Sequence, residues 1–333
     1  MTTLTSPQDV MAAVPFLLGY QPVDSLVVIS MKGDSIGMAM RIDYPEEIDP
    51  DQIDTFVSHL ERESTESALI IAYVPAEIFD CDRLLDAITD ALTVRNIQVK
   101  ESIIIRHDRW RSRICNDRDC CPLEGNPLPE FKSSRIAAEQ VADGNPLPFN
   151  NLSELIASIS AQTTPPELLA ALENLSPIDY EKDPQPDQQL GALAVSQFLK
   201  EFSDGGVIEP ELTALVLIRL QDLQVRDFAL GSITESTINS HWCAWRWLLT
   251  IAPVGYVAPV AALFAAISYE RGDGVLAQRA LDRAFADDPQ YPLASLLRRV
   301  FTAGYPPEMF ATMRNELQPK IAHTIFGKDL GVA

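Results

Sequence analysis

The hydrophobic periodicity changes along this chain, and that change constrains the fold more than any other feature of the sequence. Strand-like apolar runs occur only before residue 115, where they alternate with segments of helical spacing. From Asp187 onward, apolar residues recur only at the spacing of helices. We therefore predict an α/β domain over residues 1–150, followed by an all-α domain over residues 187–333.

The first part of the chain contains five apolar runs of strand length. They predict strands at Ser25–Ser30, Ile36–Asp43, Ala68–Val74, Val99–Arg106 and Arg109–Ile114. Gly33 and Asp34 supply turn chemistry between the first two runs, which predicts a β-hairpin. Helical segments are expected to begin at Ser6-Pro7 and to cover Asp51–Glu63 and Asp80–Val94. Strands joined through helices should run parallel, so the sheet should be mixed.

A region rich in proline follows the predicted strands. Ten of the 24 prolines lie between residues 122 and 186. Proline fixes its own φ and disfavours helix at the preceding residue, so only short helices fit between these prolines. They are predicted at Ser134–Asp143, Leu152–Ala161 and Glu167–Leu175. We interpret the region as an ordered, irregular connection that ends the α/β domain near residue 150.

The second half should be a set of helices with short connections. Helical spacing predicts helices over 187–202, 209–221, 234–251, 257–270, 274–287, 291–303 and 306–317. Ala265, Ala277, Leu281, Ala284 and Pro289 have the spacing of a tetratricopeptide-like helical hairpin. An ordinary helical pair with coincidental alanine spacing is the alternative.

Charge and composition exclude several classes of partner. Acidic residues outnumber basic ones by 47 to 26, which gives a net charge of −21. Such a surface repels phosphate backbones and anionic lipids, so neither nucleic acid nor membrane is an expected partner. The longest wholly apolar run, Val257–Ile267, is shorter than the roughly twenty residues that cross a bilayer. No Lys or Arg precedes Lys32, so a secretory signal is not expected, and we predict a cytoplasmic protein.

The common catalytic and cofactor motifs are absent from the sequence. It contains no phosphate-binding loop, dinucleotide-binding glycine pattern, serine-hydrolase elbow or His-Glu-x-x-His metal motif. The four histidines are scattered, and five cysteines do not make a disulfide scaffold. We therefore predict no cofactor and assign no enzyme class.

The segment Arg106–Gly125 is the most distinctive part of the sequence. Cys115, Cys120 and Cys121, with His107, offer a Cys₃His ligand set for zinc. Alternatively, neighbouring arginines lower a thiol pKa and create a redox-active thiolate. The third interpretation, which we favour at this point, is a tight turn with one or two buried thiols. It is favoured because adjacent cysteine side chains are expected to point in different directions.

Three arginines in the same segment suggest an anion site. Arg109, Arg111 and Arg113 alternate along the predicted strand and would therefore share one face. A row of guanidiniums can bind an anion. In so acidic a chain we favour the alternative, in which the row pairs with the protein's own carboxylates or keeps a sheet edge soluble.

Several phrases of the sequence resemble one family. They are VPFLLGYQPVDSLVVIS, HDRWRSRICNDRDCCPLEGNPLP and WRWLLTIAP, within a stretch from about Pro7 to Pro307. This pattern resembles the actinobacterial family called domain of unknown function 4192. Ser112-Arg113-Ile114 stands where that family has Ser-Tyr-Leu. The resemblance implies an intracellular protein, and it implies no particular activity, cofactor or catalytic residue.

Two functions are consistent with these features. The first is a non-catalytic interaction or regulatory protein, whose helical half binds a protein partner. The second is an enzyme, or a protein that binds a small molecule or anion. Its site would lie at the edge of the α/β sheet, around Pro22–Ser25 and Arg106–Gly125.

Overall fold

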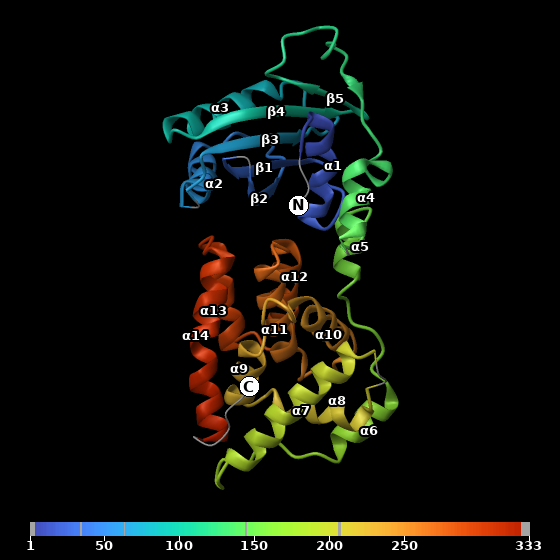
Figure 1. Cartoon of the computed structure of the whole chain (residues 1–333), viewed down its shortest axis with the longest axis vertical. Coiled ribbons are helices and arrows are strands. Elements are labelled where there is room, and N and C mark those ends of the chain that lie inside the picture. Colours follow the sequence, from blue (N-terminus) through green and yellow to red (C-terminus); the bar gives the residue numbers. More distant parts are fainter. Residues whose placement is uncertain (1–3, 34, 63, 144, 206–207, 328–333) are drawn as a thin grey trace. The chain divides into compact units, whose positions relative to one another are not determined.

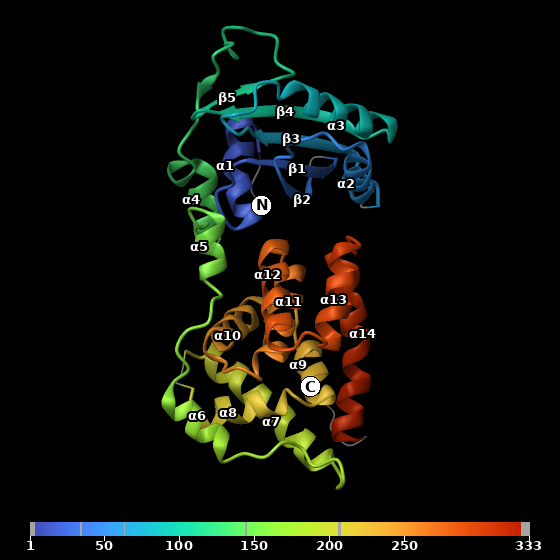
Figure 2. The same ribbon diagram turned by 180° about the vertical axis from the view of Figure 1, so that it is seen from behind.

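The chain forms two compact units, which are described separately. The computed structural model describes residues 4–33, 35–62, 64–143, 145–205 and 208–327. Residues 1–155 make up the first unit and residues 156–333 the second (Figures 1 and 2). The predicted change from strands to helices is present, since all strands of the described chain lie before residue 128.

The first unit contains six strands and the first helices of the chain. The strands are β1 (Ser25–Lys32), β2 (Ser35–Asp43), β3 (Ser67–Tyr73), β4 (Gln98–Arg106), β5 (Arg109–Ser112) and β6 (Asn126–Pro127). The helices are α1 (Pro7–Leu18), α2 (Pro50–Arg62), α3 (Asp82–Val94) and α4 (Arg135–Ala142), with a 3₁₀ turn at Phe131–Ser133. Helix α5 (Leu152–Ala157) begins in this unit and ends just past its last residue. Strand β6 was not predicted from the sequence, because a two-residue strand carries no periodicity.

The strands form one mixed sheet, as predicted. Their order is β2-β1-β3-β4-β5-β6, and among these described strands β3 and β4 are the one parallel pair. Helix α3 joins this pair, which is the crossover that parallel strands require. The hairpin of β1 and β2 closes between Lys32 and Ser35 through Gly33, whose φ is +58°. The predicted turn residue Asp34 lies outside the described residues.

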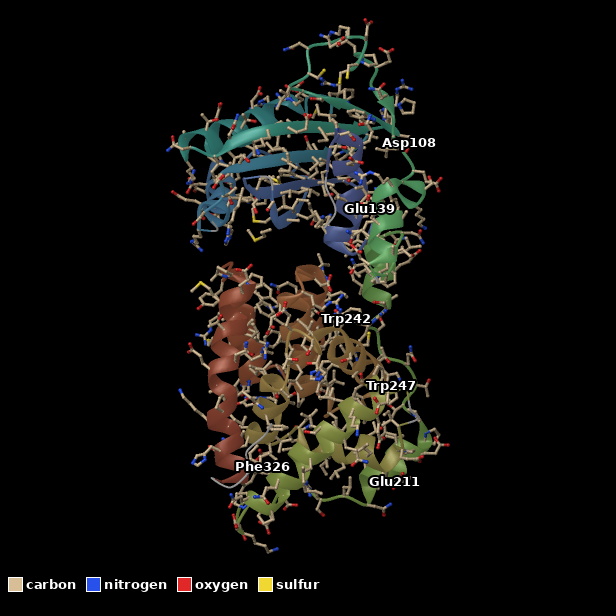
Figure 3. The ribbon with its side chains drawn as sticks, viewed as in Figure 1. Asp108, Glu139, Glu211, Trp242, Trp247 and Phe326 are labelled. Carbon is tan, nitrogen blue, oxygen red and sulfur yellow. The ribbon has the colours of Figure 1, made fainter. Side chains whose placement is uncertain are left out.

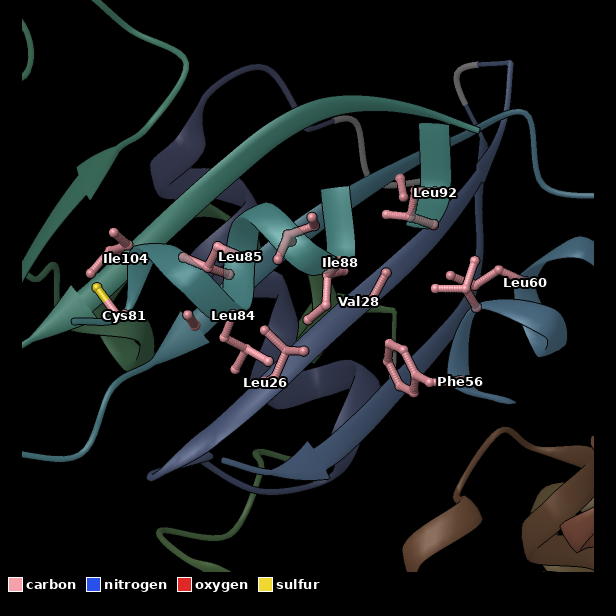
Figure 4. Packing of buried hydrophobic residues seen from close by; sticks show 14 of the residues in the cluster. Leu26, Val28, Phe56, Leu60, Cys81, Leu84, Leu85, Ile88, Leu92 and Ile104 are labelled. Atoms are coloured by element: carbon pink, nitrogen blue, oxygen red, sulfur yellow. The ribbon is translucent and has the colours of Figure 1, made fainter. Parts of the chain in front are cut away.

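Apolar side chains from α2 and α3 cover one face of the sheet. Leu26 and Val28 of β1 pack against Phe56 of α2 and Leu85 and Ile88 of α3 (Figure 4). All seven residues of β3 are buried, as expected for a continuous apolar run with both faces covered.

Helix α1 lies at the opposite face of the sheet. Met11 of α1 lines a cavity together with Tyr73 of β3 and Ile105 of β4. Each of these two strand residues directly follows one that faces α3, so both point to the opposite face of the sheet. The predicted start of α1 is confirmed, because the Ser6 side chain accepts a hydrogen bond from the Asp9 N–H. The unit therefore has helices on both sides of its sheet.

The second unit is helical. Its helices are α6 (Pro166–Glu173), α7 (Gln185–Ser203), α8 (Pro210–Arg219), α9 (Leu223–Gly231), α10 (Ile238–Ile251), α11 (Val257–Glu270), α12 (Gly274–Asp287), α13 (Pro292–Thr302) and α14 (Pro307–Phe326). Within the described chain, none of the helices combines the length and apolar character needed to cross a membrane.

Two helical features differ from the prediction. Helix α9 was missed because it is short, although Asp222 caps it by accepting hydrogen bonds from the Gln224 and Val225 N–H groups. Helix α14 continues beyond residue 317, where the predicted helix ends, and passes through Pro319. It continues because its last turns bury Ile321 and Ile325 in an apolar cluster.

Helices α11 and α12 form a closely packed hairpin. Ala265 and Ala277 are both fully buried, which is consistent with the close contact that their spacing predicts. The helical pair is therefore present, whereas its identity as a tetratricopeptide repeat stays a prediction.

A buried ion pair joins α11 to α14. The Arg314 guanidinium donates to both carboxylate oxygens of Glu270, at 2.7 and 3.0 Å, and each side chain is only 4% exposed. Arg314 also donates to the carbonyl oxygen of Ile233. These contacts offset the free-energy cost of burying the Arg314 and Glu270 charges.

We predict that Ala265→Leu and Ala277→Leu each lower the free energy of unfolding by about 1–3 kcal/mol, because neither site has room for a larger side chain. Ala170→Leu on α6 is the control, since Ala170 is exposed. Urea unfolding followed by tryptophan fluorescence reports mainly on this unit, which holds three of the four tryptophans. Equal midpoints for all three variants would contradict the packing.

The buried histidine of α10 predicts a pH dependence of stability. Burial, and to a smaller extent the charge of Arg314, lowers the pKa of His241 to about 4. The unfolded chain binds this proton near pH 6.5, whereas the folded chain binds it only near pH 4. The free energy of unfolding should therefore fall by up to about 3 kcal/mol as the pH is lowered from 7 to 4.

His241→Gln should remove this part of the pH dependence. His323→Gln is the matched control, because His323 is exposed on α14. Thermal unfolding measured between pH 4 and pH 7 separates the two variants. A His241→Gln variant with the same pH slope as the parent protein would show that this histidine is not responsible.

Candidate functional site

The hairpin of β4 and β5 is the centre of the candidate site. Arg106 ends β4, Arg109 begins β5, and only His107 and Asp108 lie between them (Figure 3 labels Asp108). Both turn residues adopt left-handed backbone conformations, with φ of +50° and +56°. Tight hairpin turns require this conformation, which Gly adopts without cost and Asn, Asp and His adopt more often than other residues. A His-Asp turn is therefore strained, and strain of this kind accumulates at functional sites.

The tight turn places two positive charges opposite each other. Arg106 and Arg109 are direct partners in the β4–β5 register, so their side chains project from the same face. Arg109 donates to the carbonyl oxygens of Glu124 and Gly125, and Arg106 donates to that of Ala76. Within the described chain, neither guanidinium forms an ion pair with a carboxylate.

A pocket of about 280 Å³ lies at these arginines. We call it the arginine pocket. It is lined by Phe79, Cys81, Asp82, Ile104, Arg106, His107, Arg109, Trp110, Arg111, Leu123, Glu124 and Gly125. The lining thus contains three guanidiniums, from Arg106, Arg109 and Arg111, and two carboxylates, from Asp82 and Glu124. The Asp82 carboxylate also binds Arg113, which lies outside the pocket. The arginine pocket is consequently a positive site on a protein whose net charge is −21.

The predicted row of three arginines is only partly present. Strand β5 ends at Ser112, so Arg113 leaves the strand and turns towards α3. There it binds Asp82 at 2.8 Å and Asp86 at 2.5 Å. Arg111 lies 3.7 Å from the same Asp82 carboxylate and lines the pocket. Arg113 is therefore paired with α3 and does not line the pocket, whereas Arg106 lies there beside Arg109 and Arg111.

A second cavity, of about 500 Å³, lies at the same end of the sheet. It brings together Pro22, Val23 and Asp24 with the turn residues His107 and Asp108, so the two segments singled out in the sequence do meet. Ser25 begins β1 and is buried. Arg106 and His107 line both cavities, but this one also contains three carboxylates, from Asp24, Asp108 and Glu130. The second cavity is therefore acidic and suits an anion less well than the arginine pocket.

The loop after β5 brings three thiols together. The sulfur atoms of Cys115, Cys120 and Cys121 all lie within 4.8 Å of one another, and those of Cys120 and Cys121 are 4.0 Å apart. The expectation that adjacent cysteine side chains diverge is therefore wrong here. A turn closed on Asp117 explains the convergence, because its carbonyl oxygen accepts from the Cys121 N–H and its carboxylate from the Cys120 N–H. His107 is not a member of this group, so the predicted Cys₃His set reduces to three thiols.

The protonation of Cys120 argues against a redox thiolate at that position. Hydrogen bonding with the Cys121 and Cys115 thiols raises the pKa of Cys120 to about 11. A reactive thiolate requires the opposite shift, which the neighbouring arginines were expected to cause. The shift at Cys120 is therefore opposite to the one predicted for a redox-active thiolate.

Two features of the site were missed in the sequence, although Arg106 belongs to the predicted segment Arg106–Gly125. Arg106 was assigned to the end of a strand. Its pairing with Arg109 could be predicted only if the number of residues in the turn were known. Phe79 is 94% exposed at the pocket, and no sequence signal distinguishes it from a buried aromatic residue. The one signal in the sequence for this pairing is that only two residues separate Arg106 from Arg109.

The close approach of the loop to β5 depends on Gly125. A Cβ atom at Gly125 would lie 2.8 Å from the carbonyl oxygen of Trp110, and its φ is +77°. We predict that Gly125→Ala destabilises this end of the sheet by about 1–3 kcal/mol more than Gly33→Ala. Gly33 is the matched control, since its φ is also positive but its Cβ would meet nothing.

Hydrogen exchange over residues 102–127 is the measurement for this pair. Gly125→Ala should accelerate exchange in β5 and in the loop, whereas Gly33→Ala should leave these residues protected. Equal protection in the two variants would show that the loop does not need its close contact with Trp110.

The comparison with protein families agrees with the resemblance in the sequence. The sequence model of DUF4192, described as a domain of unknown function, matches residues 7–308. The comparisons with curated proteins and with solved structures gave no match. The actinobacterial attribution stays a prediction. Because the match covers nearly the whole chain, this protein belongs to the DUF4192 family.

Proposed function

We propose that the α/β unit binds a small organic anion in the arginine pocket. One observation carries this proposal: Arg106 and Arg109 are cross-strand partners without an ion pair in the described chain. Like charges placed directly opposite each other on a sheet are destabilising. A bound anion would remove this repulsion and complete the charge balance of the pocket.

The surroundings of the two arginines strengthen the attraction for an anion. Arg111 adds a third guanidinium, and its pairing with Asp82 is long, at 3.7 Å. Asp82 is shared, because Arg113 binds it at 2.8 Å. The amino terminus of α3, which begins at Asp82, adds the positive end of a helix dipole. Guanidiniums bind carboxylates and phosphates through paired hydrogen bonds, so both groups suit the pocket.

The rim of the pocket indicates the rest of the ligand. Phe79 is 94% exposed and Leu123 is 70% exposed, and both line the pocket. Exposed apolar side chains beside a charged floor favour a ligand with an anionic group attached to a planar or apolar body. A volume of about 280 Å³ suits a small metabolite rather than a polymer.

The interaction role of the helical unit remains a separate prediction. Met309, Met313 and Leu317 are exposed at intervals of four residues along α14, so they form an apolar stripe. Such a stripe is one surface on which a protein partner could be sought.

Calorimetric titration of the full chain tests the proposal, with inorganic phosphate, benzoate and adenosine monophosphate as probes. We expect benzoate or the nucleotide to bind more tightly than phosphate, because only they also contact Phe79 and Leu123. Arg111→Gln should weaken binding about 10-fold to 100-fold, the effect of losing one charged hydrogen bond. Added salt should weaken binding as well.

Arg83→Gln is the matched control for the charge change. Arg83 lies one residue after Asp82, is exposed, and does not line the pocket. Its variant should bind the probes as the parent protein does. The proposal is wrong if none of the three probes binds, or if Arg111→Gln and Arg83→Gln have the same affinity.

A further inference from the structure

The loop between β5 and β6, residues 113–125, has almost no apolar core of its own. Every residue of the loop is described, and none belongs to a helix or strand. Cys121 and Gly125 are its buried residues, whereas Ile114 and Leu123 are exposed. A loop of this length without secondary structure is uncommon in a compact unit. Apolar burial therefore does not explain how the loop holds one conformation.

Hydrogen bonds within the loop, and to the strand residues at its two ends, instead converge on its cysteines. The Ser112 hydroxyl accepts from the Cys115 N–H at 3.1 Å, and the Asp117 carbonyl oxygen accepts from the Cys121 N–H at 2.7 Å. The Asn126 side chain donates to the carbonyl oxygen of Cys120 at 2.8 Å. Each cysteine backbone is thus fixed by a different partner, and together these contacts orient the three side chains towards one point.

The distances between the sulfur atoms are close to those of a thiolate metal site. Zinc–sulfur bonds of about 2.3 Å at tetrahedral angles place neighbouring sulfurs roughly 3.8 Å apart. The sulfurs of Cys120 and Cys121 are 4.0 Å apart, and the separations within the group of three reach at most 4.8 Å. A contraction of about 1 Å or less would complete the geometry.

We propose that Cys115, Cys120 and Cys121 bind one Zn²⁺ ion through their thiolates. Three thiolates leave a fourth position for water or an exogenous ligand. The bound ion would add a cross-link between the two ends of the cysteine turn, beyond the hydrogen bonds already present, since metal-binding free energy acts as folding free energy. This proposal does not depend on anion binding, although the same loop also provides Leu123, Glu124 and Gly125 to the arginine pocket.

The test uses the full chain, purified under reducing conditions without chelators or added metal. We expect elemental analysis to find one zinc ion per chain. After removal of zinc, titration with Co²⁺ should produce the sulfur-to-cobalt charge-transfer absorption of a thiolate site. Hydrogen exchange over residues 113–125 should slow when either metal is added.

Cys120→Ser and Cys115→Ser test the ligands, because both side chains are at least partly exposed and neither belongs to the apolar core. Each variant should lose at least about 100-fold in affinity, more than the loss of a residue that only orients a ligand. Cys243→Ser is the matched control, since Cys243 is an exposed cysteine on α10. Circular dichroism of each variant verifies that it folds.

Three results would overturn the proposal. The first is a parent protein that holds well below one zinc per chain and gives no charge-transfer band with Co²⁺. The second is undiminished metal affinity in Cys115→Ser and Cys120→Ser. The third is a disulfide between any two of the three cysteines, found by mass spectrometry in the protein as purified.

Discussion

The two-residue turn between β4 and β5 determines the geometry of the candidate site. Because only His107 and Asp108 separate the strands, Arg106 must lie opposite Arg109. A longer turn would allow the register to shift, and a one-residue shift would move the side chains to opposite faces. The two-residue length of this turn therefore maintains an arrangement of charge that the sheet alone would disfavour.

The parallel pairing of β3 and β4 supplies the rest of the site. Parallel neighbours need a crossover, and here the crossover is α3. The crossover begins at the end of β3, so the first residues of α3 lie beside the end of β4. Asp82 can then contact both Arg111 and Arg113. The apolar side of α3, which includes Leu85 and Ile88, fixes the helix on the sheet and leaves its amino terminus at the pocket.

Much of the fold could be predicted from the sequence because burial imposes a clear period. The continuous apolar run of β3 and the helical spacing of α3 both identify their elements, since each must cover a face of the core. Helix α9 and strand β6 were missed because each is short. A short element depends on one cap or one pair of backbone hydrogen bonds rather than on a repeated pattern.

The candidate site was less predictable because it depends on contacts between distant residues. The sequence identified Arg109 and Arg111, but it gave no indication that β5 ends at Ser112 and that Arg113 pairs with α3. Similarly, spacing alone predicts divergent side chains for Cys120 and Cys121. Only the turn around Asp117 brings their sulfurs together.

Nuclear magnetic resonance of the arginine side chains tests the central claim most directly. The Nε–Hε signals of a ¹⁵N-labelled full chain can be assigned by single substitutions and followed during titration with benzoate. The account predicts saturable shifts for Arg106, Arg109 and Arg111, with Arg83 unchanged. Shifts confined to Arg83 or to arginines of the helical unit, or no saturable shift at any arginine, would contradict an anion site at the end of β4 and β5.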